Sequence, residues 1–130
     1  MNIAVIAHDN KKADIVAFVL KRIDFFKRQD IKIISTGTTG NHMIHAGVTN
    51  VECLKSGPLG GDAQIASRLV EGGVDAVLFF IDPLFSHPHE VDIHMLMRLC
   101  NVYDIPLATN YSTAKHIIKN IENENTNTCK

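Results

Sequence analysis

A seven-residue stretch near the middle of the chain, Ser56–Asp62 (SGPLGGD), combines three glycines with one carboxylate. An apolar segment at 51–54 precedes it and a helical pattern at 64–71 follows, so it is predicted to form a strand-to-helix corner. Such a corner has little side-chain bulk, and its backbone N–H groups and the helix N-terminus stay open to an anion such as phosphate. Asp62 then stands beside that anion, although a structural role as helix N-cap is a common use of aspartate and stays open as the alternative.

Thr36–Gly40 (TGTTG) offers a similar set of ligands: successive backbone N–H groups and three threonine hydroxyls, ahead of a short helix predicted at about 41–46. Together with Ser56-Gly57 it can hold one phosphate without an arginine, and Lys12 can add a positive charge. The alternative is a well-capped turn without a ligand. The spacing matches neither the phosphate-binding loop nor the G-x-G-x-x-G motif, so a nucleotide site is not expected.

His89 and Asp92 lie three positions apart at the predicted start of a helix, with His87 close by, so both side chains can share one helix face. They can act as a capping pair, with Asp92 favoured by the helix dipole, or as part of an acid–base set beside a bound phosphate. A metal site is not expected, because the surrounding turns supply no cysteine and no repeated H-x-x-H pair. Proton abstraction next to a carbonyl needs a carboxylate base and a donor at the carbonyl oxygen, and Asp62 and His89 can fill those roles.

The elements that must position these residues are short strands alternating with helices. The predicted strands are Asn2–Ala7, Ile31–Ser35, Val51–Leu54, Asp75–Ile81 and Pro106–Thr109. The predicted helices are Lys11–Arg28, about Asn41–Ala46, Gln64–Glu71, about Glu90–Val102, and one capped by Ser112. In the first helix the predicted inward face is Val16, Val19, Leu20, Ile23 and Phe26. The polar tail from about 122 is predicted to be loose.

This alternation indicates the α/β class: a single doubly wound domain over 1–130, with a mainly parallel five-stranded sheet flanked by helices in a flavodoxin-like three-layer sandwich. The helix-to-strand turns are ordinary. The strand-to-helix turns carry His8-Asp9, Thr36–Gly40, Ser56–Asp62, Asp82–His89 and Thr109-Asn110. All strand C-termini of a parallel sheet lie on one edge, where ligands bind at the reversal of crossover direction. We therefore expect these turns to meet in one site.

The composition argues against several classes of function. With 130 residues and a formal net charge of −1, the chain has no excess of basic residues for nucleic acid or a membrane surface. The sequence shows neither a long apolar span nor a signal-peptide pattern. Cys53, Cys100 and Cys129 are far apart and odd in number, which is typical of a reducing compartment and predicts a cytoplasmic location.

The motifs taken together resemble the methylglyoxal synthase family. The segments that carry the resemblance are AHD (Ala7–Asp9), TGTTG (Thr36–Gly40), SGPLGGD (Ser56–Asp62), DP (Asp82-Pro83), PHEVD (Pro88–Asp92) and PLATN (Pro106–Asn110). The match runs from about Ile3 to about Ile118, in the family's order and spacing. Related domains of carbamoyl phosphate synthetase share the fold but not the full set of motifs.

The resemblance implies a methylglyoxal synthase-like fold and the conversion of glycerone phosphate (dihydroxyacetone phosphate) to methylglyoxal and inorganic phosphate, without metal or cofactor. It assigns the catalytic base to Asp62, and the donor to the substrate's carbonyl and hydroxyl oxygens to His89. The other carboxylates of the catalytic set fall on Asp9, Asp82 and Asp92. The contacts to phosphate and substrate fall on His8, Lys12, Thr36, Gly37, Thr38, Thr39, Ser56 and Gly57.

The resemblance also implies a homohexamer inhibited by phosphate. Family members often carry a late arginine that reaches the phosphate, and this chain departs from them because no arginine follows Arg98. A function of another class also stays open. A stand-alone regulatory module that binds a phosphorylated metabolite needs the phosphate loops, but only the enzyme needs Asp62, His89 and Asp92 together.

Overall fold

A five-stranded sheet, parallel throughout, forms the middle layer, with strand order β3-β2-β1-β4-β5. The computed structural model describes the backbone of residues 1–84 and 90–127, and their side chains except those of 58, 90–92 and 125–127. The strands are β1 (Asn2–Ala7), β2 (Lys32–Ser35), β3 (Val51–Cys53), β4 (Ala76–Phe80) and β5 (Leu107–Ala108). β1 lies in the centre, where Ile3 aligns with Ile33 of β2 on one side and Ala76 of β4 on the other.

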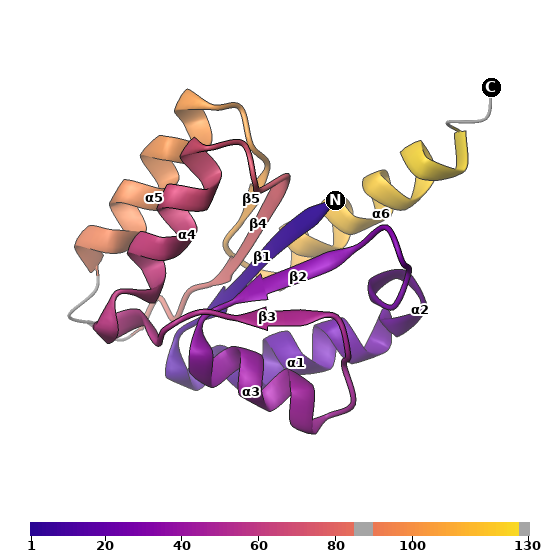
Figure 1. Ribbon diagram of the computed structural model, residues 1–130, viewed down its shortest axis with the longest axis horizontal. Coiled ribbons are helices and arrows are strands. Elements are labelled where there is room, and N and C mark those ends of the chain that lie inside the picture. Colours follow the sequence, from indigo (N-terminus) through magenta and orange to yellow (C-terminus); the bar gives the residue numbers. More distant parts are fainter. Residues whose placement is uncertain (85–89, 128–130) are drawn as a thin grey trace.

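Helices cover both faces of this sheet (Figure 1). They are α1 (Lys12–Lys21), α2 (Ile23–Phe26), α3 (Gly37–His45), α4 (Gly61–Val70), α5 (Glu90–Val102) and α6 (Tyr111–Asn127), with short 3-10 turns η1 (Asp9–Lys11) and η2 (Gly57–Leu59). One face carries α1, α2, α3 and α6, and the other carries α4 and α5. The predicted doubly wound three-layer sandwich is confirmed, with a strand order different from the 2-1-3-4-5 of flavodoxin itself. Among the described helices, none is long and apolar enough to cross a bilayer.

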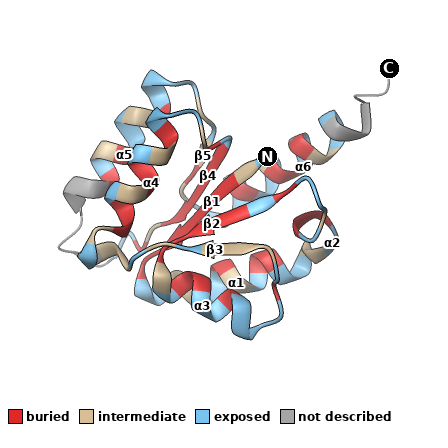
Figure 2. Ribbon diagram, viewed as in Figure 1, coloured by how far each residue is buried: buried red, intermediate tan, exposed pale blue. Residues whose placement is uncertain are grey.

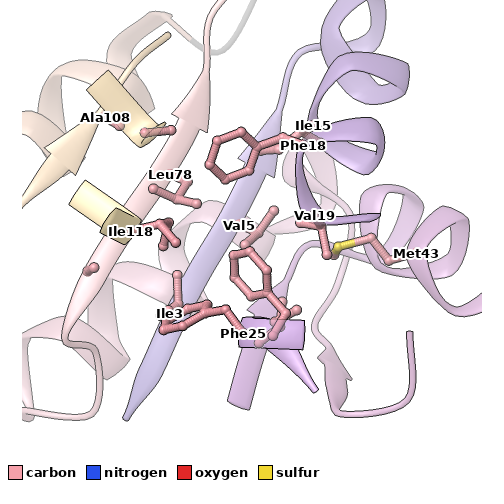
Figure 3. Packing of buried hydrophobic residues seen from close by; sticks show 14 of the residues in the cluster. Ile3, Val5, Ile15, Phe18, Val19, Phe25, Met43, Leu78, Ala108 and Ile118 are labelled. Carbon is pink, nitrogen blue, oxygen red and sulfur yellow. The ribbon is translucent and has the colours of Figure 1, made fainter. Parts of the chain in front are cut away.

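Each face of the sheet has its own apolar core, and successive residues of β1 alternate between the two. Ile3 and Val5 join the core beneath α1 and α6, whereas Ala4 and Ile6 join the core beneath α4 and α5. Figure 3 shows Ile3 and Val5 among the side chains of the first core. The central strands are consequently buried over most of their length (Figure 2). Strands covered on both faces consist of continuous apolar runs, which is why the sequence predicts them well.

The helix predicted over 11–28 is interrupted at Arg22, whose φ of −119° and ψ of 31° are not helical. The residues that α1 buries are Ile15, Phe18 and Val19, and the predicted Leu20 is instead 39% exposed. A continuous helix with this buried stripe would turn position 22 toward the core as well, and burying an unpaired charge is costly. The interruption leaves the Arg22 guanidinium over the Phe18 ring, 4.1 Å from its centroid.

The bounds of other helices also differ from the prediction. The helix expected at about 41–46 begins at Gly37, so TGTTG forms its first turn and does not precede it as a loop. Glycine and threonine are poor helix formers, and tertiary packing overrides that preference here. The tail predicted to be loose from about 122 is helical as far as Asn127. Asn110 and not Ser112 caps this last helix, because its Oδ1 accepts a hydrogen bond from the Thr113 N–H at 2.9 Å.

The direction of the crossovers reverses between β1 and β4. The first strands build the sheet outward from β1 to β3, and the chain then returns to the opposite side of β1 to place β4 and β5. In open α/β sheets the crevice at such a reversal is where ligands bind. The carboxyl ends of β1 and β4 meet there, and the His8 N–H donates to the Phe80 carbonyl at 3.1 Å.

Candidate active site

A cavity of about 200 Å³ opens at this carboxyl edge, with Ile6, Ala7 and Phe79 as its apolar lining. The predicted site residues that line it are His8, Asp9, Lys12, Thr36, Thr38, Ser56, Gly57 and Asp62. They come from the turns after β1, β2 and β3, which are far apart in the sequence. The expectation that the strand-to-helix turns converge on one site is therefore met for these three turns.

Asp62 is the second residue of α4, and its side chain is nearly buried, with the residue 3% exposed. The N-cap of this helix is Gly60, whose φ of 105° favours glycine. The alternative role of Asp62 as an N-cap is therefore wrong. Its carboxylate lies against Gly57, because a Cβ built at Gly57 would be 3.5 Å from Asp62 Oδ2 and 3.6 Å from Oδ1. Because Gly57 has no side chain, that residue does not cover the carboxylate in the cavity wall that both residues form.

Gly61 lets the start of α4 pack directly against the backbone of the preceding loop. A Cβ at this position would lie 1.9 Å from the Lys55 carbonyl oxygen, and the Gly61 N–H donates to the Ser56 carbonyl at 2.9 Å. Gln64 Oε1 accepts a hydrogen bond from the Lys55 N–H at 2.8 Å. These contacts hold the loop that carries Ser56 against the helix that carries Asp62. Sequence reasoning missed Gln64, because nothing local marks a helical glutamine as the partner of a loop amide.

The far side of α4 is tied to the sheet by an ion-pair cluster. The Arg68 guanidinium makes two hydrogen bonds to the Glu52 carboxylate of β3, and Lys32 Nζ lies 2.7 Å from Glu52 Oε1. Hydrogen bonding to Arg68 and then to Lys32 lowers the pKa of Glu52 to about 2. The cluster fixes α4 relative to β2 and β3, two of the three strands whose following turns line the cavity.

The first turn of α3 supplies the second wall of the cavity. Thr36 is the N-cap residue but makes no side-chain capping bond, so its side chain is not committed to closing the helix end. The Gly37 N–H donates to the Lys55 carbonyl at 3.3 Å. Thr36 and Thr38 line the cavity, whereas the Thr39 side chain is fully buried, and its hydroxyl has no hydrogen-bond partner among the described residues. Two of the three expected hydroxyls are thus at the cavity.

Lys12 brings a cation to the cavity from the first turn of α1. Its Nζ lies 2.7 Å from Asp9 Oδ1, and its side chain is 16% exposed, against 87% for Asp9. The exposed carboxylate of Asp9 therefore pairs with a largely buried Lys12 side chain at the cavity wall. The N-termini of α1, α3 and α4 all reach this cavity, and their dipoles favour a negatively charged ligand.

His8 and Asp82 connect the ends of β1 and β4. The Asp82 N–H donates to His8 Nδ1 at 2.9 Å, and the imidazole packs edge-on against Phe79 with centroids 5.3 Å apart. The Asp82 carboxylate accepts hydrogen bonds from Asn10 Nδ2 at 2.9 Å and from the Leu84 N–H at 3.1 Å. His8 lines the cavity, whereas Asp82 is not among its lining residues in the described part of the chain. Sequence reasoning missed Asn10.

The remaining predicted residues are only partly within the described chain. His89 lies outside the described residues, and Asp92 belongs to the first turn of α5 without a described side chain. Gly37 belongs to the wall turn of α3 but is not among the described residues that line the cavity. Within the described ranges, no three His, Cys, Asp or Glu side chains form a group that could hold a metal ion.

Comparison with known proteins gives a family match over most of the chain. Residues 18–109 match the model of the MGS-like domain family. A methylglyoxal synthase of Borrelia garinii subsp. bavariensis is 49% identical over 124 residues, which cover 95% of this chain and 97% of that protein. A methylglyoxal synthase of Borreliella afzelii is 51% identical over 92% of this chain and 93% of its own length.

A solved structure and a longer protein are also similar to this chain. The crystal structure of a methylglyoxal synthase from Elizabethkingia anophelis NUHP1 is similar with a TM-score of 0.80 and 38% identity, over 90% of this chain and 76% of that one. An uncharacterised protein of Synechocystis is 50% identical over 118 residues, but the chain spans only 27% of its length.

Proposed function

The chain belongs to the methylglyoxal synthase family, and we propose that it converts glycerone phosphate to methylglyoxal and inorganic phosphate with Asp62 as the general base. It is an enzyme with a small-molecule substrate, a carbon–oxygen lyase of methylglyoxal biosynthesis. The observation that carries the proposal is the buried Asp62 carboxylate in the cavity wall, next to Gly57, which has no side chain to cover it.

The substrate phosphate binds at the helix N-termini. Thr36, Thr38 and the backbone of the α3 first turn donate to its oxygens, together with Gly37 and Thr39 through their backbone. Ser56-Gly57, Lys12 and His8 complete the set. Hydrogen bonds to a charged phosphate contribute more than neutral ones, about 1.5–3 kcal/mol each, so these donors can hold a small dianion without an arginine.

Asp62 removes a proton from the substrate carbon that bears the free hydroxyl. The C–H electrons move into a carbon–carbon double bond, and the carbonyl oxygen takes up negative charge to give an ene-diolate. Such an intermediate needs hydrogen-bond donors in a site that excludes water. His89 is the proposed donor to the carbonyl and hydroxyl oxygens, and Asp9, Asp82 and Asp92 complete the proposed carboxylate set.

The ene-diolate then expels phosphate. Its electrons displace the bridging carbon–oxygen bond, the phosphate leaves with that electron pair, and the enol that remains takes up a proton to become methylglyoxal. The bond can break only when it stands out of the ene-diolate plane, where it overlaps the π electrons. The donors at Thr36–Thr39 and Ser56-Gly57 hold the phosphate in that pose and accept its charge as it departs.

The finer properties of the family belong to the same proposal. Residues 1–130 act as one domain, and the protein is a cytoplasmic homohexamer that works without metal or cofactor. Inorganic phosphate is both product and inhibitor, because it fits the donors that hold the substrate's phosphate. The chain has no arginine after Arg98, so the contact from a late arginine is not part of the proposed site.

The experiment is turnover of glycerone phosphate by the purified chain, with release of inorganic phosphate and of the dicarbonyl followed separately. Asp62→Asn keeps the shape of the side chain but removes the base, and we expect kcat to fall about 10²–10⁴-fold. Asp24→Asn is the control, since Asp24 is an exposed aspartate of α2 and should leave kcat unchanged. Equal activity of Asp62→Asn and the unchanged chain would remove Asp62 from its role.

The same assay separates the alternatives. A regulatory module would bind inorganic phosphate or glycerone phosphate without releasing any product. Formation of glyceraldehyde phosphate in place of free phosphate would contradict the out-of-plane pose, because isomerisation shares the ene-diolate but keeps the bridging bond.

A further inference from the structure

Asn10, Asp82 and His8 form a chain of hydrogen bonds that ends at the cavity. The Asn10 side-chain amide donates to Asp82 Oδ2 at 2.9 Å, and the Asp82 backbone N–H donates to His8 Nδ1 at 2.9 Å. A third bond, from the Leu84 N–H to Asp82 Oδ1 at 3.1 Å, holds the other carboxylate oxygen. Asn10 and Asp82 are 72 positions apart in the sequence, so these hydrogen bonds join the turn after β1 to the turn after β4.

The direction of the bond to His8 determines which ring nitrogen carries hydrogen. A backbone amide can only donate, so His8 Nδ1 accepts and has no proton of its own. A neutral imidazole has one N–H, and with Nδ1 as acceptor that hydrogen lies on Nε2. An imidazolium is excluded in this geometry because both of its nitrogens are donors. His8 therefore brings to the cavity a neutral ring with a single N–H donor.

We propose that Asn10 is a positioning residue that, through Asp82, holds His8 in the Nε2–H tautomer. Asn10 donates to the carboxylate of Asp82, and the backbone N–H of Asp82 donates to the His8 ring. By fixing the Asp82 side chain, Asn10 therefore also fixes the direction of the Asp82 N–H. Nδ1 and Nε2 point to nearly opposite sides of the ring, so the bond at Nδ1 directs the Nε2 donor away from the Asp82 backbone. Asp82 thus connects Asn10 to His8 in this series of hydrogen bonds.

The residue type at position 10 suits this task. The amide of Asn10 supplies a donor without a charge, and its side chain is at the surface, so its hydrogen bond contributes little to the apolar cores. An aspartate at the same place would put a second carboxylate beside Asp82 and remove the donor. The charged groups that share the cavity with His8 among the described residues are Asp9, Lys12 and Asp62.

The consequence for catalysis depends on the proposed function. A neutral Nε2–H donor can bind a phosphate or carbonyl oxygen of the substrate without giving up a proton. In the other tautomer Nε2 is an acceptor, and it would face the substrate's anionic oxygens without a hydrogen to donate. We expect this to weaken binding more than the chemical step, and KM to rise more than kcat falls. The tautomer itself can be measured without any turnover.

The test is ¹⁵N NMR of the full chain labelled at the histidine rings, with the His8 signals assigned by their loss in His8→Gln. The unchanged protein should show Nε2 protonated and Nδ1 unprotonated, and added inorganic phosphate should shift the Nε2 signal. In Asn10→Ala the ratio of the Nε2–H to the Nδ1–H tautomer should fall about fivefold, the factor that one hydrogen bond contributes. Asn10→Asp should lower it further, and Asn120→Ala, an exposed asparagine of α6, should leave it unchanged.

A His8 ring that is doubly protonated or protonated at Nδ1 in the unchanged protein overturns the proposal. So does an unchanged tautomer ratio in both Asn10 variants. If the tautomer shifts but no variant turns over glycerone phosphate, the positioning role stands and the proposed function fails. Because Asn10 is exposed, both variants should keep the melting temperature of the unchanged chain, and Asn10→Asp provides the measurement should Asn10→Ala fail to fold.

Discussion

Replacing Gly61 by alanine tests whether the cavity depends on the close approach of α4 to the loop before it. The added Cβ would lie 1.9 Å from the Lys55 carbonyl oxygen and 2.9 Å from Thr36 Cγ2, whereas real Cβ atoms essentially never come within 3.0 Å of such neighbours. The Lys55 oxygen belongs to the backbone and cannot rotate away. The start of α4 must therefore move by on the order of 1 Å relative to the loop, as overpacking forces backbone shifts.

The size of the effect follows from that movement. Overpacking of this kind costs about 1–3 kcal/mol, and the better helix propensity of alanine offsets about 0.5–1 kcal/mol of it. A net loss near 1–2 kcal/mol lowers the melting temperature of a domain this size by roughly 4–8 °C. Asp62 is the next residue, so its carboxylate moves relative to the cavity, and a misplacement of about 1 Å can reduce kcat by on the order of 10²-fold.

The assay combines thermal unfolding with steady-state turnover of glycerone phosphate at a temperature where all variants are folded. The matched control is Gly73→Ala, just beyond the other end of α4, where the added Cβ would lie 3.2 Å from the Arg68 carbonyl oxygen. This change should cost some stability and leave kcat as it is. A Gly61→Ala protein that keeps both its melting temperature and its kcat would refute the reasoning, because the contact would then not position Asp62.

Two further changes test the surroundings of the site. Glu52→Gln removes a carboxylate whose pKa is lowered from 4.5 to about 2, so its stabilisation is full above about pH 4.5 and is lost as the pH falls toward 2. The free energy of unfolding of the variant, measured in urea at pH 7, should be about 0.2–1 kcal/mol lower. Between pH 4.5 and 2 it should fall less steeply than that of the unchanged protein, and an equal slope for both proteins would contradict this. Gly57→Ala places a methyl 3.5 Å from Asp62 Oδ2, an ordinary contact, so the melting temperature should hold. The methyl enters the cavity, and KM should rise roughly 10-fold or more for a steric cost of about 1–3 kcal/mol; an unchanged KM would show that the substrate binds elsewhere.

The strands and the site loops illustrate what local sequence can predict. β1 is predicted with its observed bounds because a strand buried on both faces is a continuous apolar run, here the buried residues 3–7 after the half-buried Asn2. The glycine-rich loops are equally visible, since close backbone approach at Gly61 and a positive φ at Gly60 need glycine itself. Local patterns predict less well where helix propensity and tertiary packing disagree. At TGTTG the residues are poor helix formers, but packing makes them the first turn of α3.

Other features depend on partners that are remote in the sequence. The interruption at Arg22 depends on which face of α1 meets the sheet. Gln64 and Asn10 acquire their roles from Lys55 and Asp82, and neither residue has a local signature that announces such a partner. Thr39 looks like its neighbours in the motif, but the rotation of α3 turns its side chain inward.

The sequence by itself determined the α/β class, the family, and the gathering of polar turns at one edge of a parallel sheet, because periodicity and turn chemistry are local properties. Only the tertiary structure decided the order β3-β2-β1-β4-β5 and, with it, which turns surround the cavity. It also decided that Asp62 lies against Gly57 and that His8 accepts a hydrogen bond from Asp82. The strand order and the contact between His8 and Asp82 join segments far apart in the sequence. They form only when the two apolar cores pack together, and no single segment encodes that packing.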